Sequence, residues 1–394
     1  MEKGGNMPNL FQNPYECCGC TACSSVCPAG AIRMQPDEEG FLYPFIDKNA
    51  CVGCGSCEHV CQMKTERNRN NPFSIFAAKN LDSQIRAASS SGGVFSLLAE
   101  YIEIQGGVIY GAAFDPFFCV RHQRAESRKE WLAFCGSKYV QSDVNDCFLR
   151  IKQDLQDSRR VLFSGTPCQV EALMRFLADV DTTNLLTVDV VCHGAPSPMI
   201  WREWLTGLEK KTGKKTRTVN FRAKEKTGWH HSSVLITGEN GEILECSTHS
   251  ENAFSRMYFR HLIVRPACHA CRYAGFQRPG DLTLGDYWGV EKQLPDFNDD
   301  KGVSLVLCCS EKGVAAWNAI CNRVESVSVE KHQCEQPSLL QRTEEAKGRS
   351  SFWTLYRRYG LSVAMKVFKI VPASPCEAVL IKGFRACLRA IGKL

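Results

Sequence analysis

Two runs of four cysteines near the N-terminus have the residue type and the spacing that hold iron-sulfur clusters. Each run reads C-x2-C-x2-C-x3-C, the spacing of bacterial two-cluster ferredoxins. In such modules three cysteines of a run bind one cluster and the fourth binds the other. We therefore predict two 4Fe-4S clusters. The expected ligands are Cys17, Cys20, Cys23 and Cys61 for one cluster, and Cys51, Cys54, Cys57 and Cys27 for the other.

Zinc sites and disulfides are the alternatives for these cysteines, and the spacing argues against both. A zinc ribbon uses paired C-x2-C knuckles about 15–20 residues apart, whereas each run here has four cysteines and the run recurs. Cys18 is the spare thiol of the first run, because its adjacency to Cys17 makes it a poor ligand.

Four further cysteines follow predicted strands or stand at turns: Cys168, Cys192, Cys268 and Cys271. The last two form a C-x2-C knuckle that can hold two corners of a metal centre, and the two strand-end cysteines could complete it. The residues alone leave three alternatives open, namely a third 4Fe-4S cluster, a zinc site and inert buried thiols. For the remaining eleven cysteines we expect ordinary packing in strands and helices.

Ferredoxin clusters pass single electrons, whereas most metabolic reductions need two, and a flavin can connect the two kinds of transfer. The sequence lacks G-x-G-x-x-G and a P-loop, but three Gly-containing turns could hold a flavin. The helix after the first turn is expected to begin with a serine N-cap. The predicted cofactor contacts are Ser90, Ser91, Gly92, Gly93, Gly136, Ser137, Lys138, Tyr139, Gly165 and Thr166.

The pattern of elements around these residues predicts a mixed fold of the α+β or α/β type. Strands alternate with helices between residues 73 and 200, and short strands between 218 and 246 indicate an antiparallel insertion. The predicted parts are a leader (1–14), a ferredoxin-like module (15–64), a linker (65–72), a domain for FAD and the third cluster (73–340) and a basic helical tail (341–394).

Charge and hydropathy exclude several classes of protein. The last 54 residues carry a net charge of +8 and the rest of the chain −2, so basic residues gather in the tail without a nucleic-acid-binding motif. No signal peptide and no membrane-spanning segment are predicted, so we expect a cytoplasmic protein. The tail pattern is compatible with two alternatives: amphipathic helices that contact lipid or an acidic ferredoxin, and a helix pair that simply covers the domain.

Six segments, taken in order, resemble the coenzyme F420 hydrogenase/dehydrogenase beta-subunit family, whose members are iron-sulfur flavoproteins. The resemblance favours FAD at the glycine-containing turns and a third 4Fe-4S cluster at Cys168, Cys192, Cys268 and Cys271. The segments that carry it are Ser-Ser-Gly-Gly-Val-Phe-Ser (90–96), Gly-Ser-Lys-Tyr-Val-Gln-Ser (136–142), Gly-Thr-Pro-Cys-Gln (165–169), Cys-His-Gly-Ala-Pro-Ser (192–197), Cys-His-Ala-Cys (268–271) and Gly-Asp-Tyr-Trp-Gly (285–289).

The resemblance implies an oxidoreductase that relays electrons between ferredoxin or a partner subunit, the clusters, FAD and a two-electron substrate. Three functions stay open: a ferredoxin-linked reductase with its own substrate, a beta subunit specific for coenzyme F420, and an electron-transfer subunit without a substrate. His193 is a candidate proton donor or a strand-end cap, and Lys138 is a candidate catalytic residue or cofactor contact.

Overall fold

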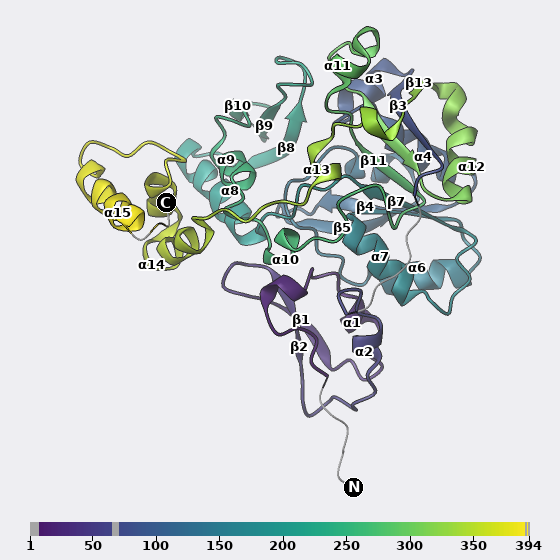
Figure 1. Ribbon diagram of the computed structural model, residues 1–394, viewed down its shortest axis with the longest axis horizontal. Helices are drawn as coiled ribbons and strands as arrows, with labels where there is room; N and C mark the ends of the chain where they lie inside the picture. Colours follow the sequence, from purple (N-terminus) through teal and green to yellow (C-terminus); the bar gives the residue numbers. More distant parts are fainter. Residues whose placement is uncertain (1–7, 65–70, 391, 393–394) are drawn as a thin grey trace.

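The computed structural model describes residues 8–64, 71–390 and 392. The first seven residues of the predicted leader and residues 65–70 of the predicted linker lie outside this part of the chain. The fold is the predicted mixture of a small N-terminal module, an α/β body with an antiparallel insertion, and C-terminal helices (Figure 1).

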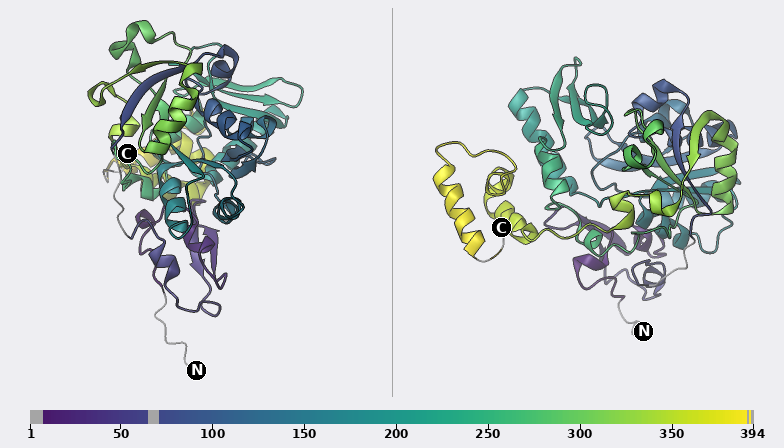
Figure 2. Two further views of the ribbon diagram at one scale, coloured as in Figure 1. Left: turned by 90° about the vertical axis from the view of Figure 1, so that its right-hand side faces the viewer. Right: turned by 45° about the horizontal axis from the view of Figure 1, so that its top comes forward.

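The N-terminal module is built from one strand pair and two single-turn helices. The strands β1 (Ile32–Pro36) and β2 (Leu42–Ile46) pair antiparallel, as predicted. Helices α1 (Ala22–Ser25) and α2 (Ser56–His59) each lie within one cysteine run. Gly55 precedes α2 with a φ of 75°, a conformation that glycine adopts without steric cost. The module projects beyond one edge of the body (Figure 2).

An eight-stranded mixed sheet forms the centre of the body. Its strand order is β13-β3-β12-β11-β7-β6-β4-β5, and the four strands β4, β6, β7 and β11 run parallel. Parallel strands place their carboxyl ends at one edge, which is where ligands bind in such sheets. The strands are β3 (Ser74–Asn80), β4 (Val108–Phe114), β5 (Val120–Ala125), β6 (Val161–Gly165), β7 (Leu185–Val190), β11 (Leu282–Asp286), β12 (Ser304–Cys308) and β13 (Val324–Ser328).

Helices cover both faces of this sheet. Helices α4 (Val94–Ile104) and α12 (Glu311–Ile320) pack into one apolar cluster, and α6 (Cys147–Gln156) and α7 (Pro167–Phe176) pack into a cluster that includes the opposite side chains of β4 and β6. Because the central strands are buried on both faces, their sequences are near-continuous apolar runs. One prediction is wrong in detail, because the N-cap of α4 is Gly93 with a φ of 83° rather than a serine.

The antiparallel insertion is confirmed as a separate three-stranded sheet of order β10-β9-β8. It shares an apolar cluster with two helices that flank it in the sequence and with the C-terminal helix α14. The elements of this cluster are β8 (Thr216–Ala223), β9 (Ser233–Gly238), β10 (Ile243–Thr248), α8 (Pro198–Thr212), α9 (Ala253–Phe259) and α14 (Arg349–Val367).

The C-terminal helices differ from each other in burial. Phe352 and Trp353 of α14 are at most 1% exposed, so this part of the tail belongs to the core of the insertion. In α15 (Ala378–Ala390), by contrast, Val379 and Leu380 are exposed, and the helix lies far from the large sheet (Figure 1). In the described ranges no helix has both the length and the apolar sequence that crossing a bilayer requires.

The remaining elements are short helical segments that connect the larger ones. They are α3 (Ser83–Ala88), α5 (Arg128–Trp131), α10 (Pro266–His269), α11 (Val290–Gln293), α13 (Pro337–Leu340), and the 3-10 turns η1 (Pro14–Glu16), η2 (Leu132–Phe134), η3 (Pro295–Phe297), η4 (Cys321–Arg323) and η5 (Lys331–Gln333).

Candidate iron-sulfur and flavin site

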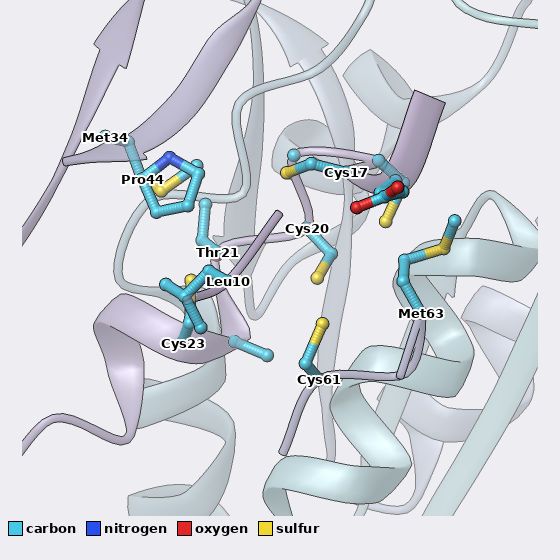
Figure 3. A pocket seen from close by; sticks show the side chains of 13 residues that line it. Leu10, Cys17, Cys20, Thr21, Cys23, Met34, Pro44, Cys61 and Met63 are labelled. Carbon is cyan, nitrogen blue, oxygen red and sulfur yellow. The ribbon is translucent and has the colours of Figure 1, made fainter. Parts of the chain in front are cut away.

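The first set of predicted ligands surrounds one cavity of the N-terminal module. Cys17, Cys20, Cys23 and Cys61 all line this cavity. Figure 3 shows the side chains of Cys20 and Cys61 pointing toward one another, although they belong to different cysteine runs. We call these four residues the first cradle. Their grouping is the interlocked arrangement that the spacing predicts.

The second set lines another cavity in the same module. Cys27 comes from the first run, and it lies beside Cys51, Cys54 and Cys57 of the second run. The Ala31 backbone N–H donates to the Cys27 sulfur at 3.3 Å. Hydrogen bonds of this kind stabilise cluster thiolates, so these four residues form a second cradle that fits a cluster.

The thiols of the module are suited to a metal partner rather than to each other. All 23 cysteines of the chain lie in its described part, and each is free of a disulfide. Burial raises the pKa of the Cys17 thiol to about 11, an effect that the Arg265 guanidinium opposes. A buried thiol of this kind loses its proton readily only when a metal binds the thiolate, and the proton is then released to solvent.

Four cysteines of the body come together at the edge where the parallel strands end. Cys168 is the second residue of α7, which follows β6, and Cys192 follows β7. Cys268 lies in α10, and Cys271 follows that helix. Burial and the nearby charges of the other cysteines raise the pKa of Cys192 to about 12 and also raise that of Cys268. We call these four residues the third cradle.

Each sulfur of the third cradle has a hydrogen-bond partner from the protein. The distances to the sulfurs are between 3.1 and 3.4 Å, and three of the four partners are backbone N–H groups that donate to the sulfur. Such hydrogen bonds stabilise thiolates. The donors around these four cysteines therefore favour a cluster site over a set of inert thiols. The pairs are Thr166 Oγ1 with Cys168, Gly194 N with Cys192, Ala195 N with Cys268, and Tyr273 N with Cys271.

Within the described ranges, no three His, Cys, Asp or Glu side chains are grouped tightly enough to hold a single metal ion. Cluster ligands stand further apart than the ligands of one ion, because the cluster itself fills the space between them. The cavities of the first and second cradles have this character.

Cys18 lies between the first and third cradles. Its thiol donates toward the sulfurs of Cys20 and Cys168, which raises the pKa of Cys18 and lowers the pKa of each partner, that of Cys20 to about 7. The side-chain amide of Gln62 also donates to the Cys18 sulfur at 3.1 Å. The spare cysteine of the first run therefore connects one cradle of the module with the cradle of the body.

The structure brings the first two predicted flavin turns together. The Ser90 hydroxyl accepts the backbone N–H of Ser137 at 2.7 Å and lies 3.0 Å from the Ser137 hydroxyl. Gly136 has a φ of 81° and open space where a side chain would stand. A turn with these properties allows a ligand to approach the backbone closely.

Several predicted contacts in these turns already have protein partners. The N–H of Gly92 donates to the Ser304 hydroxyl, and Ser91 donates to the Val303 carbonyl. Lys138 donates to the carbonyls of Ala133 and Cys135, and burial lowers the pKa of Lys138 to about 8. These contacts fix the shape of the turns.

Gly165 and Thr166, the third set of predicted flavin contacts, lie beside the third cradle. Gly165 ends β6, and Thr166 caps α7 while its hydroxyl contacts the Cys168 sulfur at 3.1 Å. Thr166 therefore positions Cys168 of the third cradle, whereas a flavin contact from Gly165 or Thr166 stays a prediction.

Tyr139 leads from the second turn to a buried polar cluster. The Arg222 guanidinium contacts the Tyr139 hydroxyl at 3.5 Å and the Asp286 carboxylate at 3.1 Å. Two buried nitrogens nearby, Nε of Arg222 and Nε2 of His249, have no hydrogen-bond partner among the described residues. Buried polar groups are rarely left unpaired, so their presence fits a polar ligand between the turns and the insertion.

His193 contacts a second histidine rather than a carboxylate. Its Nε2 lies 3.0 Å from Nε2 of His261, and its Nδ1 lies 3.0 Å from the Ser338 hydroxyl. Burial and the neighbouring His261 lower the pKa of His193 to about 4. The ring of Tyr258 lies 5.4 Å from that of His193 and 5.5 Å from that of Tyr139, which links this pair to the flavin turns.

Comparison with known protein families shows which families this chain is related to. Residues 158–332 match the family described as the C terminus of the coenzyme F420 hydrogenase/dehydrogenase beta subunit, and residues 16–65 match a 4Fe-4S dicluster domain. Residues 158–332 of this chain belong to the coenzyme F420 hydrogenase/dehydrogenase beta-subunit family. This family member is therefore an iron-sulfur protein of an oxidoreductase type, as the sequence predicts.

Solved structures and curated proteins add little to the assignment. One similar structure is a chain of the F420-reducing NiFe hydrogenase complex from Methanosarcina barkeri, at 17% identity and a TM-score of 0.46. The similarity covers 68% of this family member and 85% of that chain. No curated protein matches the chain.

Sequence reasoning missed several residues of the site. In this family member Asp286 pairs with Arg222, and Gln62 and Arg265 lie against the first cradle. Asp286 stands in the Gly-Asp-Tyr-Trp segment, which was a usable signal. Arg265 precedes the Cys-His-Ala-Cys knuckle by three residues, but Arg222 and Gln62 carry no signal because only the fold brings them close.

Proposed function

We propose that this chain is an iron-sulfur flavoprotein oxidoreductase that exchanges electrons between ferredoxin or a partner redox subunit and a small two-electron substrate. The observation that carries the proposal is the presence of three cysteine cradles, two in the N-terminal module and one in the body, with Cys18 between the first and the third. When bound, 4Fe-4S clusters supply single-electron transfer, and FAD supplies the exchange between one-electron and two-electron chemistry.

The residues have separate tasks in this proposal. The eight cysteines of the module hold two clusters, and the third cradle holds another. The turns joined by Ser90 and Ser137 hold the FAD phosphates, while Lys138 fixes the second turn. Arg222 and Asp286 orient polar groups of the bound cofactor or substrate. His193, held neutral by burial, accepts or donates a proton only through its pair with His261.

Coenzyme F420 is the second candidate substrate, and the match of residues 158–332 to a family named for it favours this candidate. A third function is that of an electron-transfer subunit without a substrate. In all three, we place the protein in the cytoplasm. The exposed apolar side chains and basic residues of α15 are suited to contact with a partner or a membrane surface.

One titration separates these functions. The protein is purified without oxygen, its iron and FAD are counted, and reduced coenzyme F420 or reduced ferredoxin is then added. Bleaching of the flavin band by reduced F420 identifies the F420-specific function, and bleaching by ferredoxin alone favours the ferredoxin-linked reductase or the transfer subunit. A colourless preparation without iron or a yellow chromophore would contradict the proposal.

A further inference from the structure

Arg265 is a buried cation without a carboxylate partner. Its side chain is 1% exposed, at the N-cap of α10. Among the described residues no Asp or Glu forms an ion pair with it, although other buried arginines of the chain have such pairs. A buried charge is costly unless it is compensated, so an anion is expected beside this guanidinium. The paired arginines are Arg222 with Asp286, Arg278 with Asp189, and Arg349 with Glu39.

The contacts of Arg265 point to where that anion lies. Its Nε donates to the Cys17 carbonyl at 2.8 Å, and Nη2 lies 3.8 Å from the Cys17 sulfur. Nη2 also donates to the Leu42 carbonyl at 2.9 Å, and the guanidinium lies 4.3 Å from the centre of the Tyr43 ring. Three of these contacts are to neutral groups, and the fourth is to a predicted cluster ligand.

The neighbouring glycine shows how closely the guanidinium approaches the first cradle. A β-carbon at Gly19 would stand 2.7 Å from Nη1 of Arg265, and Gly19 has a φ of 71°. Gln141 accepts from Nη1 at 3.0 Å and donates to the Cys18 carbonyl at 3.0 Å. Arg265 is therefore held in one place by the backbone of the first cysteine run and by a side chain of the body.

We infer that Arg265 is the counter-charge of the cluster in the first cradle and raises the reduction potential of that cluster. The inference rests on the proposed function, which places a cluster at Cys17, Cys20, Cys23 and Cys61. Reduction adds one negative charge to a thiolate-bound cluster, and a fixed positive charge in a water-poor site stabilises the reduced form. Arg265 acts as a positioning residue, because it contacts a ligand and the backbone rather than a substrate.

The test compares three variants of the full chain purified without oxygen. Arg265→Gln removes the charge, Arg265→Lys keeps it, and Arg349→Gln removes another buried arginine that joins the same module to the body through Glu39. Iron is counted, and the clusters are reduced stepwise while their electron paramagnetic resonance signals are followed. We expect one cluster of Arg265→Gln to be reduced at a more negative potential, with all potentials unchanged in Arg265→Lys and Arg349→Gln.

Each result bears on the inference. An iron-replete Arg265→Gln protein with unchanged potentials contradicts it, and so does an Arg265→Lys protein whose potential moves as far as that of Arg265→Gln. If Arg265→Gln loses iron, retention of iron by Arg265→Lys supports the role of the charge, and equal loss in both contradicts it. Wild-type protein without iron would instead contradict the proposed function, so the two failures are distinguishable.

Discussion

The side-chain amide of Gln62 donates to the backbone carbonyl of Cys168, and this contact joins the N-terminal module to the α/β body. The same amide nitrogen lies 3.1 Å from the Cys18 sulfur, and Gln62 is 2% exposed. One buried side chain thus contacts Cys168 of the third cradle and the Cys18 thiol, which lies between that cradle and the first.

Replacement of Gln62 by Ala should therefore destabilise the protein. It removes a buried amide that donates to the Cys168 carbonyl and to the Cys18 sulfur, and the loss of such buried hydrogen bonds costs about 1–3 kcal/mol. We expect a lower melting temperature in calorimetry under nitrogen. Gln35→Ala, at an exposed position of β1, is the matched control and should melt like the wild type. Equal melting of both variants would mean that the contact contributes nothing to stability.

The interlocked cradles predict which cysteine variants behave alike. Cys17→Ala and Cys61→Ala should lose the same cluster signal, although the residues are 44 positions apart, because they line one cavity. Cys51→Ala should lose the other signal of the module together with Cys27→Ala. Each variant should contain about a third less iron if three equal clusters are bound. Electron paramagnetic resonance and iron analysis measure both effects.

Cys18→Ala is the control for these ligand variants. Its thiol is a neighbour of Cys20 and Cys168 rather than a predicted ligand, so the iron content should stay at the wild-type value. If Cys18→Ala lost a cluster and Cys61→Ala kept it, Cys18 rather than Cys61 would be the fourth ligand of the first cradle.

Replacement of a cysteine of the third cradle should remove only the cluster bound there. Cys192→Ala should lose one cluster and keep the two of the N-terminal module, because the third cradle lies in the body. Cys309→Ala is the control, since Cys309 is a 2% exposed cysteine directly after β12 whose loss removes only core packing. Wild-type iron content in Cys192→Ala would show that no cluster binds there.

The contact between the two flavin turns predicts an effect on FAD without an effect on iron. Ser90→Ala leaves the Ser137 N–H without its acceptor, so FAD should bind about tenfold more weakly, which corresponds to about 1.4 kcal/mol. Fluorescence of released FAD, divided by iron content, measures the change. Ser89→Ala should retain FAD, because the Ser89 hydroxyl donates to Ile85 of its own helix. An equal loss in both would indicate general damage to the turn.

The buried side chain of His122 should make the free energy of unfolding depend on pH. Burial, with a smaller contribution from Lys138, lowers the pKa of His122 to about 4, and the ring is held by Ser142 and the Ser164 carbonyl. Below pH 6.5 the unfolded chain binds a proton that the folded chain does not, so the free energy of unfolding falls as the pH falls toward 4. At pH 5 this loss amounts to about 2 kcal/mol for one such group.

Denaturant unfolding under nitrogen at pH 7 and pH 5 tests this effect. His122→Asn removes the titrating group, so the difference between the two pH values should be smaller than in the wild type. It should not vanish, because burial also lowers the pKa of His193 and His249 to about 4. The same pH difference in the variant and the wild type would show that His122 titrates alike in the folded and unfolded states.

The sequence by itself determined the local chemistry of this protein. Cysteine spacing acts over a few residues, so it identified the two runs and the exchange of Cys27 and Cys61 between cavities. Apolar periodicity also identified the strand pair of the module, most strands of the sheet and the antiparallel insertion. It missed strands such as β5 and β13, whose short and partly polar segments show little periodicity.

Only the tertiary structure decided which distant side chains meet. Gln62 and Arg265 reach the cysteines because the module docks on the edge where the parallel strands end, and nothing in their local sequence encodes that contact. The first tail helix is core because Phe352 and Trp353 pack with the insertion, whereas its sequence also suited an exposed amphipathic helix. Spacing along the chain fixes what neighbouring residues can bind, but the environment of a buried charge depends on elements hundreds of residues away.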